Sequence, residues 1–168
     1  LVLLLASGSW AAEAAPSEEG FVSLFDGKTL NGWKVGENPD QFRVEDGKIV
    51  MECATKKNGP AHLFYCGDVA QHAFKNFDLK VEVMTFPGAN SGIYFHTKYQ
   101  PASWPEFGQE CQVNNSHVDW RRTGSLWGTK NVTWGPETPP ADNQEATLVL
   151  PKAAVTDETA AIMVEPIQ

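Results

Sequence analysis

Two short runs in the middle of the chain carry the residue types that transfer protons and bind hydroxyl groups. They are residues 90–97 and 108–115. Side chains alternate between the two faces of an extended strand, so each run predicts one apolar and one polar face. The polar faces are expected to lie side by side and open to water, as in a sugar-binding cleft. They carry Tyr94, His96, Glu110, Gln112 and Asn114.

The acids and the imidazole are the candidates for catalysis. Ordinary glycoside hydrolysis uses two carboxyl groups, but the second run offers Glu110 followed on the same face by two amides. Glu82 could supply a second carboxylate if its strand lies near Glu110. We therefore predict Glu110, His96 and Glu82 as candidate catalytic residues for proton transfer. The alternatives are a loop anchor for Glu110, a surface strand residue for His96 and a solvated acid for Glu82.

Amides and aromatic rings are the candidates for holding a sugar. Indole rings suit the C–H groups of a sugar ring, although a β-rich core also needs tryptophan. Asn90 also fits a turn entering a strand, where Asn and Gly tolerate unusual backbone angles. The predicted substrate-binding residues are Asn90, Tyr94, Gln112, Asn114, Trp104 and Trp127. We predict no cofactor and no metal site; a divalent ion on Glu110 and His96 is the alternative.

Length and charge narrow the class of protein. A chain of 168 residues suits one domain with its own core, and a net charge of −8 argues against a nucleic-acid partner. The densest basic clusters, Lys56-Lys57 and Arg121-Arg122, fall in expected loops. The sequence gives no indication of the oligomeric state.

The first residues look like a leader. Residues 1–6 are apolar, and Ala12-Glu13-Ala14 fits a small-x-small cleavage pattern. We expect residues 1–19 to be a signal peptide whose beginning is missing, with a linker, and the mature protein to be secreted or periplasmic. The run is too short to cross a bilayer; a buried N-terminal strand is the alternative. Cys53 and Cys66 could pair across a hairpin, and Cys111 is expected in the core.

The remaining pattern is all-β. Short alternating runs separated by turn residues predict a sandwich or jelly roll. Trp33 is assigned to the core. The hairpin is expected around Asp46-Gly47. The predicted strands fall in residues 20–28, 41–45, 48–53, 62–66, 77–86, 90–97, 108–115 and 124–128.

Four ordered motifs resemble the 3-keto-disaccharide hydrolase domain family. They are residues 21–33, 90–95, 108–113 and 123–128, within a resemblance that covers residues 20–132. The resemblance implies a concanavalin-like jelly-roll sandwich of two antiparallel sheets, formed by one domain over residues 20–168, and a carbohydrate substrate oxidised at carbon 3.

The chain departs from the family in two places. His96 stands where many members carry Arg. Residues 143–168 lack the expected Trp-containing strand pair, so the jelly roll could be incomplete at its C-terminus. A truncation, a divergent ending or a reading-frame error would each account for this. The apolar stretches 148–150 and 162–164 are expected to substitute in part.

A ketone at carbon 3 would lessen the need for two acids. It acidifies the hydrogen at carbon 2, so one base can start an elimination that expels the group on carbon 1. The resemblance thus favours an exported enzyme that cleaves 3-keto glycosides, with the amides holding hydroxyls or the keto oxygen. Two alternatives remain: a non-catalytic carbohydrate-binding module, and a laminin-like adhesion domain.

Overall fold

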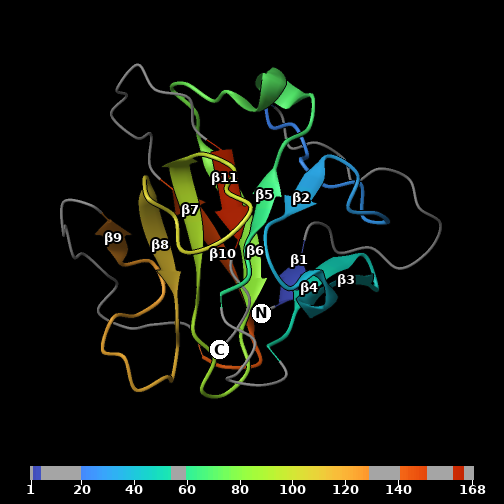
Figure 1. The fold of residues 1–168 in the computed structure, drawn as a ribbon. Helices are drawn as coiled ribbons and strands as arrows, with labels where there is room; N and C mark the ends of the chain where they lie inside the picture. The colour runs from blue at the N-terminus through green and yellow to red at the C-terminus, as the bar shows by residue number, and fades with distance from the viewer. Residues whose placement is uncertain (1, 5–19, 54–59, 129–140, 151–160, 165–168) are drawn as a thin grey trace.

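The computed structural model describes residues 2–4, 20–53, 60–128, 141–150 and 161–164, which form two antiparallel β-sheets (Figure 1). One sheet has the strand order β10-β6-β1-β4-β3 and the other β2-β5-β11-β7-β8-β9. The described helical segments are two short 3-10 turns, η1 (Pro39–Gln41) and η2 (Val69–His72). The strands of the first sheet are β1 (Val2–Leu4), β3 (Phe42–Glu45), β4 (Lys48–Met51), β6 (Leu79–Met84) and β10 (Glu145–Leu150). Those of the second are β2 (Trp33–Val35), β5 (Leu63–Tyr65), β7 (Ser91–Thr97), β8 (Gln109–Val113), β9 (Leu126–Gly128) and β11 (Ala161–Val164).

The all-β prediction is confirmed, and local sequence explains the clearest elements. The β3–β4 hairpin turns at Asp46 and Gly47, both with positive φ, as a tight two-residue turn requires. In β6 every second residue is buried, which matches its apolar alternation. The jelly-roll connectivity stays a prediction.

Both sheets contribute to one apolar core. The five-stranded sheet provides Ile49, Met51, Val81 and Val83, and the six-stranded sheet provides Leu63, Ile93, Phe95, Cys111 and Val113, among others. Trp33 packs against this core as predicted, and its indole Nε1 donates to the Leu24 carbonyl at 2.9 Å. Cys111 lies in the core, where burial raises the pKa of its thiol to about 12. The pairing considered for Cys53 and Cys66 is wrong: no disulfide joins them. Cys53 follows β4 of one sheet and Cys66 follows β5 of the other, so the hairpin expected between them does not form.

The strand predicted over residues 20–28 is wrong. Side chains there bond to the local backbone instead: Ser23 Oγ donates to the Phe25 carbonyl, and Asp26 Oδ1 accepts the backbone N–H groups of Lys28 and Thr29. Such bonds offer the backbone an alternative to a sheet ladder. The next strand, β2, begins only at Trp33.

Both ends of the chain add strands to the sheets. Within the expected leader, Val2–Leu4 forms β1 and pairs with both β4 and β6. In the tail, β10 pairs with β6, and β11 lies between β5 and β7. The expectation that the two apolar tail stretches add strands is confirmed, whereas cleavage of the leader stays a prediction. No helix within the described ranges has the length and apolarity needed to cross a bilayer.

Candidate active site

Three side chains in adjacent strands form a row across the outer face of the six-stranded sheet. Tyr94 in β7 is the register partner of Glu110 in β8, and Glu110 is the partner of Trp127 in β9. Their sequence neighbours Ile93 and Cys111 belong to the core on the other face. The predicted alternation is therefore confirmed at these positions, and it brings an acid between two aromatic residues.

The Glu110 carboxylate is held in a defined place. The hydroxyl of Tyr94 donates to its Oε2 at 3.1 Å. Its Oε1 occupies the space that glycine leaves at position 92, since a Cβ there would stand 2.1 Å from that oxygen. The expectation of a water-exposed face is wrong here: Glu110 is only 7% exposed. Glutamate is rarely buried unless it is paired, so the buried Glu110 is a candidate functional residue.

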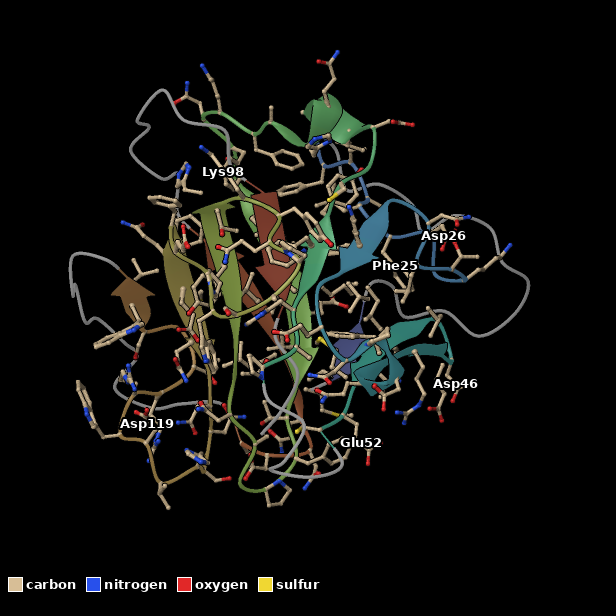
Figure 2. The ribbon with its side chains drawn as sticks, viewed as in Figure 1. Phe25, Asp26, Asp46, Glu52, Lys98 and Asp119 are labelled. Carbon is tan, nitrogen blue, oxygen red and sulfur yellow. The ribbon has the colours of Figure 1, made fainter. Side chains whose placement is uncertain are left out.

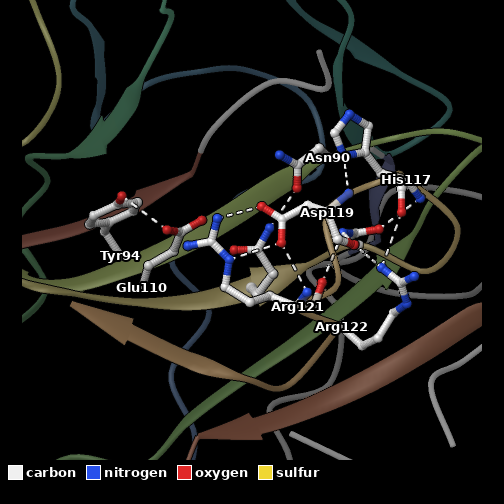
Figure 3. A network of polar contacts seen from close by, with 9 residues as sticks. Asn90, Tyr94, Glu110, His117, Asp119, Arg121 and Arg122 are labelled. Atoms are coloured by element: carbon white, nitrogen blue, oxygen red, sulfur yellow. Dashed lines mark hydrogen bonds and ion pairs between the residues drawn. The ribbon is translucent and has the colours of Figure 1, made fainter. Parts of the chain in front are cut away.

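A fixed cation lies beside this carboxylate. Arg121 Nε donates to Asp119 Oδ1 at 2.9 Å, its Nη2 donates to Asp119 Oδ2, and the guanidinium lies 4.1 Å from the centre of the Trp127 ring. In Figure 3 the Glu110 carboxylate lies between Tyr94 and the Arg121 guanidinium. The hydrogen bond from Arg121 holds the pKa of Asp119 to about 2. Asp119 is therefore ionised at neutral pH, and it fixes Arg121.

The predicted amides are engaged within the protein. Gln112 Nε2 donates to Asn90 Oδ1 at 2.5 Å. Asn114 is completely buried; its Nδ2 donates to the carbonyls of Asp119 and Arg121, and its Oδ1 accepts from the His117 backbone. The structure thus uses Asn114 to shape the loop that carries Arg121, instead of exposing it to a ligand.

The expected place of His96 beside Tyr94 is wrong. His96 has a φ of 58°, and the pairing of β7 with β11 shifts register between Tyr94 and Thr97. An extra residue in one strand disrupts the ladder locally and can re-aim a nearby side chain. The His96 ring instead packs near Phe77 and Phe95, at 5.9 and 5.5 Å between ring centres. Neither ring nitrogen has a hydrogen-bond partner among the described residues, and burial lowers the pKa of this imidazole.

Glu82 does not supply a second carboxylate at Glu110. It lies in β6 of the five-stranded sheet, where its register partners are Leu4 and Thr147. Glu110 belongs to the other sheet. Alternation correctly predicts that Glu82 faces away from the core, but it cannot tell which sheet a strand joins.

The other predicted aromatic, Trp104, lies over a different part of the same sheet. Its side chain belongs to an exposed loop, is 49% exposed, and stands edge-on to His62 at 5.4 Å. In the same loop Tyr99 packs against Phe64 of β5. The loop begins after β7 at Lys98, at the opposite end of these strands from Asp119 (Figure 2). The structure places Trp127, but not Trp104, in direct contact with the site.

Two hollows lie elsewhere on the molecule. One of about 200 Å³ lies beneath residues 20–24 and includes Trp33 and Ile93 in its lining. The other, of about 570 Å³, is lined by Arg43, Glu52 and Met84 among others. Neither is lined by Glu110. In the part of the chain that the structure describes, no group of three His, Cys, Asp or Glu residues could hold a metal ion.

Sequence reasoning missed three residues of this site. Gly92 falls in the predicted strand 90–97, but the strand pattern does not indicate that its missing side chain makes room for Glu110. Arg121 and Asp119 were assigned only to a polar loop. One signal in the sequence could have identified them: Asp119 and Arg121 carry opposite charges two residues apart. They also come shortly before Trp127, which is expected on the same face of the sheet as Glu110.

Comparison with known proteins identifies the family of this chain. The chain is 38% identical over 81 residues to a protein of Bacteroides thetaiotaomicron named 3-keto-disaccharide hydrolase; the match covers 46% of this chain and 27% of the relative. The chain thus spans about a quarter of the curated relative's length. No solved structure gives a significant match. The model of the 3-keto-alpha-glucoside-1,2-lyase-like domain matches residues 20–156, so the chain belongs to that family.

Proposed function

We propose that this chain cleaves glycosides oxidised at carbon 3, with Glu110 as the group that takes the proton. The family supports a carbohydrate enzyme of the 3-keto-disaccharide hydrolase type. The observation that carries the residue assignment is the buried Glu110 carboxylate, bonded to Tyr94 and adjacent to Arg121. The apolar residues 1–6 and the Ala12-Glu13-Ala14 pattern support our further proposal that the protein acts after export. In the full chain Val2–Leu4 pairs with β4 and β6, so removal of the leader on export would also remove those strand contacts.

A ketone allows one carboxylate to do work that otherwise needs two. Glu110 takes the hydrogen on carbon 2 as a proton, and the electron pair left behind is shared with the oxygen on carbon 3 as an enolate. Collapse of the enolate breaks the bond from carbon 1 to its oxygen, and the departing oxygen takes up a proton. This gives an unsaturated ketone, and addition of water then gives the 3-keto sugar. The route requires one base, a donor to the enolate oxygen and an acid for the leaving group.

The experiment compares a 3-keto disaccharide with its unoxidised parent. We expect cleavage of the keto substrate alone, and a loss of at least about 100-fold in kcat for Glu110→Gln. Glu82→Gln is the matched control, because Glu82 lies on the other sheet, and it should retain full activity. Equal cleavage of the parent, or unchanged turnover by Glu110→Gln, would remove the proposal.

One observation favours a second candidate, a carbohydrate-binding module without catalysis. Trp104 exposes about half of its surface beside the buried His62, and an exposed indole is a platform for a sugar ring. Glycan binding that is lost in Trp104→Ala but survives Glu110→Gln, with no turnover of any keto substrate, would favour this function.

A further inference from the structure

We propose that Arg121 binds the oxygen on carbon 3 of the substrate and stabilises the negative charge that forms on it. This inference rests on the proposed function and deepens it, since it names the group that makes the keto sugar the preferred substrate. Removing a proton from carbon 2 transfers charge to that oxygen, so a fixed positive charge lowers the barrier more than it favours the neutral ketone.

The position of Arg121 suits this role. Glu110 lies between Tyr94 and Arg121 (Figure 3). The Arg121 guanidinium also lies against the ring of Trp127, the strand neighbour of Glu110. The pKa of Arg121 is raised, first by its hydrogen bond to Asp119 and further by the nearby charges of Asp119 and Glu110. Glu110 and Arg121 therefore lie close enough for their charges to interact. The reaction requires this, because the proton leaves carbon 2 while the negative charge forms on the oxygen of the adjacent carbon 3.

The guanidinium is held on one edge and one face. The Asp119 carboxylate accepts hydrogen bonds from Nε and Nη2, and the Trp127 ring packs against one face of the guanidinium. Within the described ranges, Nη1 makes no hydrogen bond, and the side chain is 23% exposed. A planar guanidinium fixed in this way can direct its remaining N–H groups at an incoming oxygen with little loss of freedom.

The amides are less suited to the same task. Both donors of Asn114 are used by backbone carbonyls, and Gln112 donates to Asn90. The hydroxyl of Tyr94 donates to Glu110. A neutral amide also stabilises an enolate less than a charged donor does. Among the described groups around Glu110, Arg121 is thus the strongest candidate donor.

The neighbouring arginine provides a matched control. Arg122 Nη1 donates to the backbone carbonyls of His117 and Asp119, and these hydrogen bonds stabilise the conformation of the loop. Substitution of Arg122 removes the same functional group one residue away. It should affect stability while leaving the chemistry at Glu110 largely intact.

Two readouts on the full chain test the role of Arg121. One is cleavage of a 3-keto disaccharide; the other is exchange of the carbon-2 hydrogen with deuterated water, followed by NMR on a 3-keto sugar that lacks a good leaving group. Arg121→Met should lower both rates about 100-fold with a smaller change in KM, and Arg121→Lys should recover part of the loss. Added guanidinium ion should raise the rate of Arg121→Ala, whereas Arg122→Met should stay within about threefold of the wild type.

The outcomes separate this inference from the proposed function. Wild-type exchange and cleavage together with an unimpaired Arg121→Met overturn the role of Arg121 and leave the proposed function standing. A wild-type chain that neither exchanges nor cleaves overturns both. The double variant Asp119→Asn/Arg121→Met removes both charges of the ion pair, so it guards against misfolding caused by an unpaired acid; it should show the same loss while retaining the wild-type circular dichroism spectrum.

Discussion

Tyr94 and Glu110 lie opposite each other in the β7–β8 ladder, and the hydroxyl of one donates to the carboxylate of the other at 3.1 Å. A directly opposed pair in an antiparallel ladder is among the closest side-chain neighbours that a sheet provides. The pairing fixes the Oε2 side of the carboxylate, while Gly92 leaves room for the Oε1 side. Side chains and backbone of two neighbouring strands thus help to orient the acid.

Removing the tyrosine hydroxyl tests that orientation. Tyr94→Phe should lower kcat about tenfold, because Glu110 loses the donor that holds it, while the aromatic packing stays. Turnover of the 3-keto disaccharide measures the effect. Tyr99→Phe is the control: its hydroxyl reaches the Val35 carbonyl at 3.5 Å, over the β2 side of the sheet, and its loss should leave kcat unchanged. Equal effects of the two substitutions would contradict a specific role for Tyr94.

Gly92 should be required because of the space it leaves for Glu110. An added Cβ would stand 2.6 Å from both Cγ and Cδ of Glu110, so Gly92→Ala must displace the acid. We expect at least about a tenfold loss of kcat, with a smaller effect on the melting temperature because a side-chain end can move. A double-mutant cycle supplies the check. If the alanine acts only through Glu110, it should lower activity no further in a Glu110→Ala background, and a further independent loss would contradict this explanation.

The half-buried imidazole of His96 predicts a pH dependence of stability. Burial lowers the pKa of His96 below its ordinary value of 6.5, so the unfolded chain binds the proton first as the pH falls. This group therefore has no effect on stability above about pH 6.5 and destabilises the fold below it, by at most about 1.4 kcal/mol per pH unit. Urea unfolding at pH 5.5 and 8 measures this difference.

His96→Phe should reduce that difference, because phenylalanine keeps the contacts with Phe77 and Phe95 and removes the titrating group. The exposed His72 provides the control, and His72→Gln should keep the wild-type dependence on pH. An unchanged acid dependence in His96→Phe would show that other groups cause it.

The contrast between Glu110 and His96 shows how far sequence reasoning reaches. Strict alternation correctly puts Glu110 on the same face as Tyr94 and puts Cys111 in the core, because nothing interrupts β8. The same reasoning fails at His96, since a change of register in β7 depends on its pairing with the distant β11. Glu82 shows a related limit. The local sequence determines which face of its strand Glu82 lies on, but long-range strand pairing determines which sheet that strand joins. The place of Arg121 could not be predicted for a third reason. A loop whose backbone is bonded to the Asn114 side chain brings Arg121 back to the sheet, and strand patterns do not describe loops.

The strand β1 should contribute to the stability of the five-stranded sheet. Val2–Leu4 pairs with β4 on one side and β6 on the other, so it completes the middle of the five-stranded sheet. A shortened chain that begins at Gly20 would leave both neighbouring strands without these hydrogen bonds. Its free energy of unfolding should fall by at least about 2 kcal/mol, measured by urea denaturation.

Leu3→Pro in the full chain offers a matched test, because proline cannot donate to a central ladder and should destabilise the fold in the same direction. Equal stability of the shortened and full chains would mean that β4 and β6 do not depend on β1, and would support the removal of residues 1–19 as a leader.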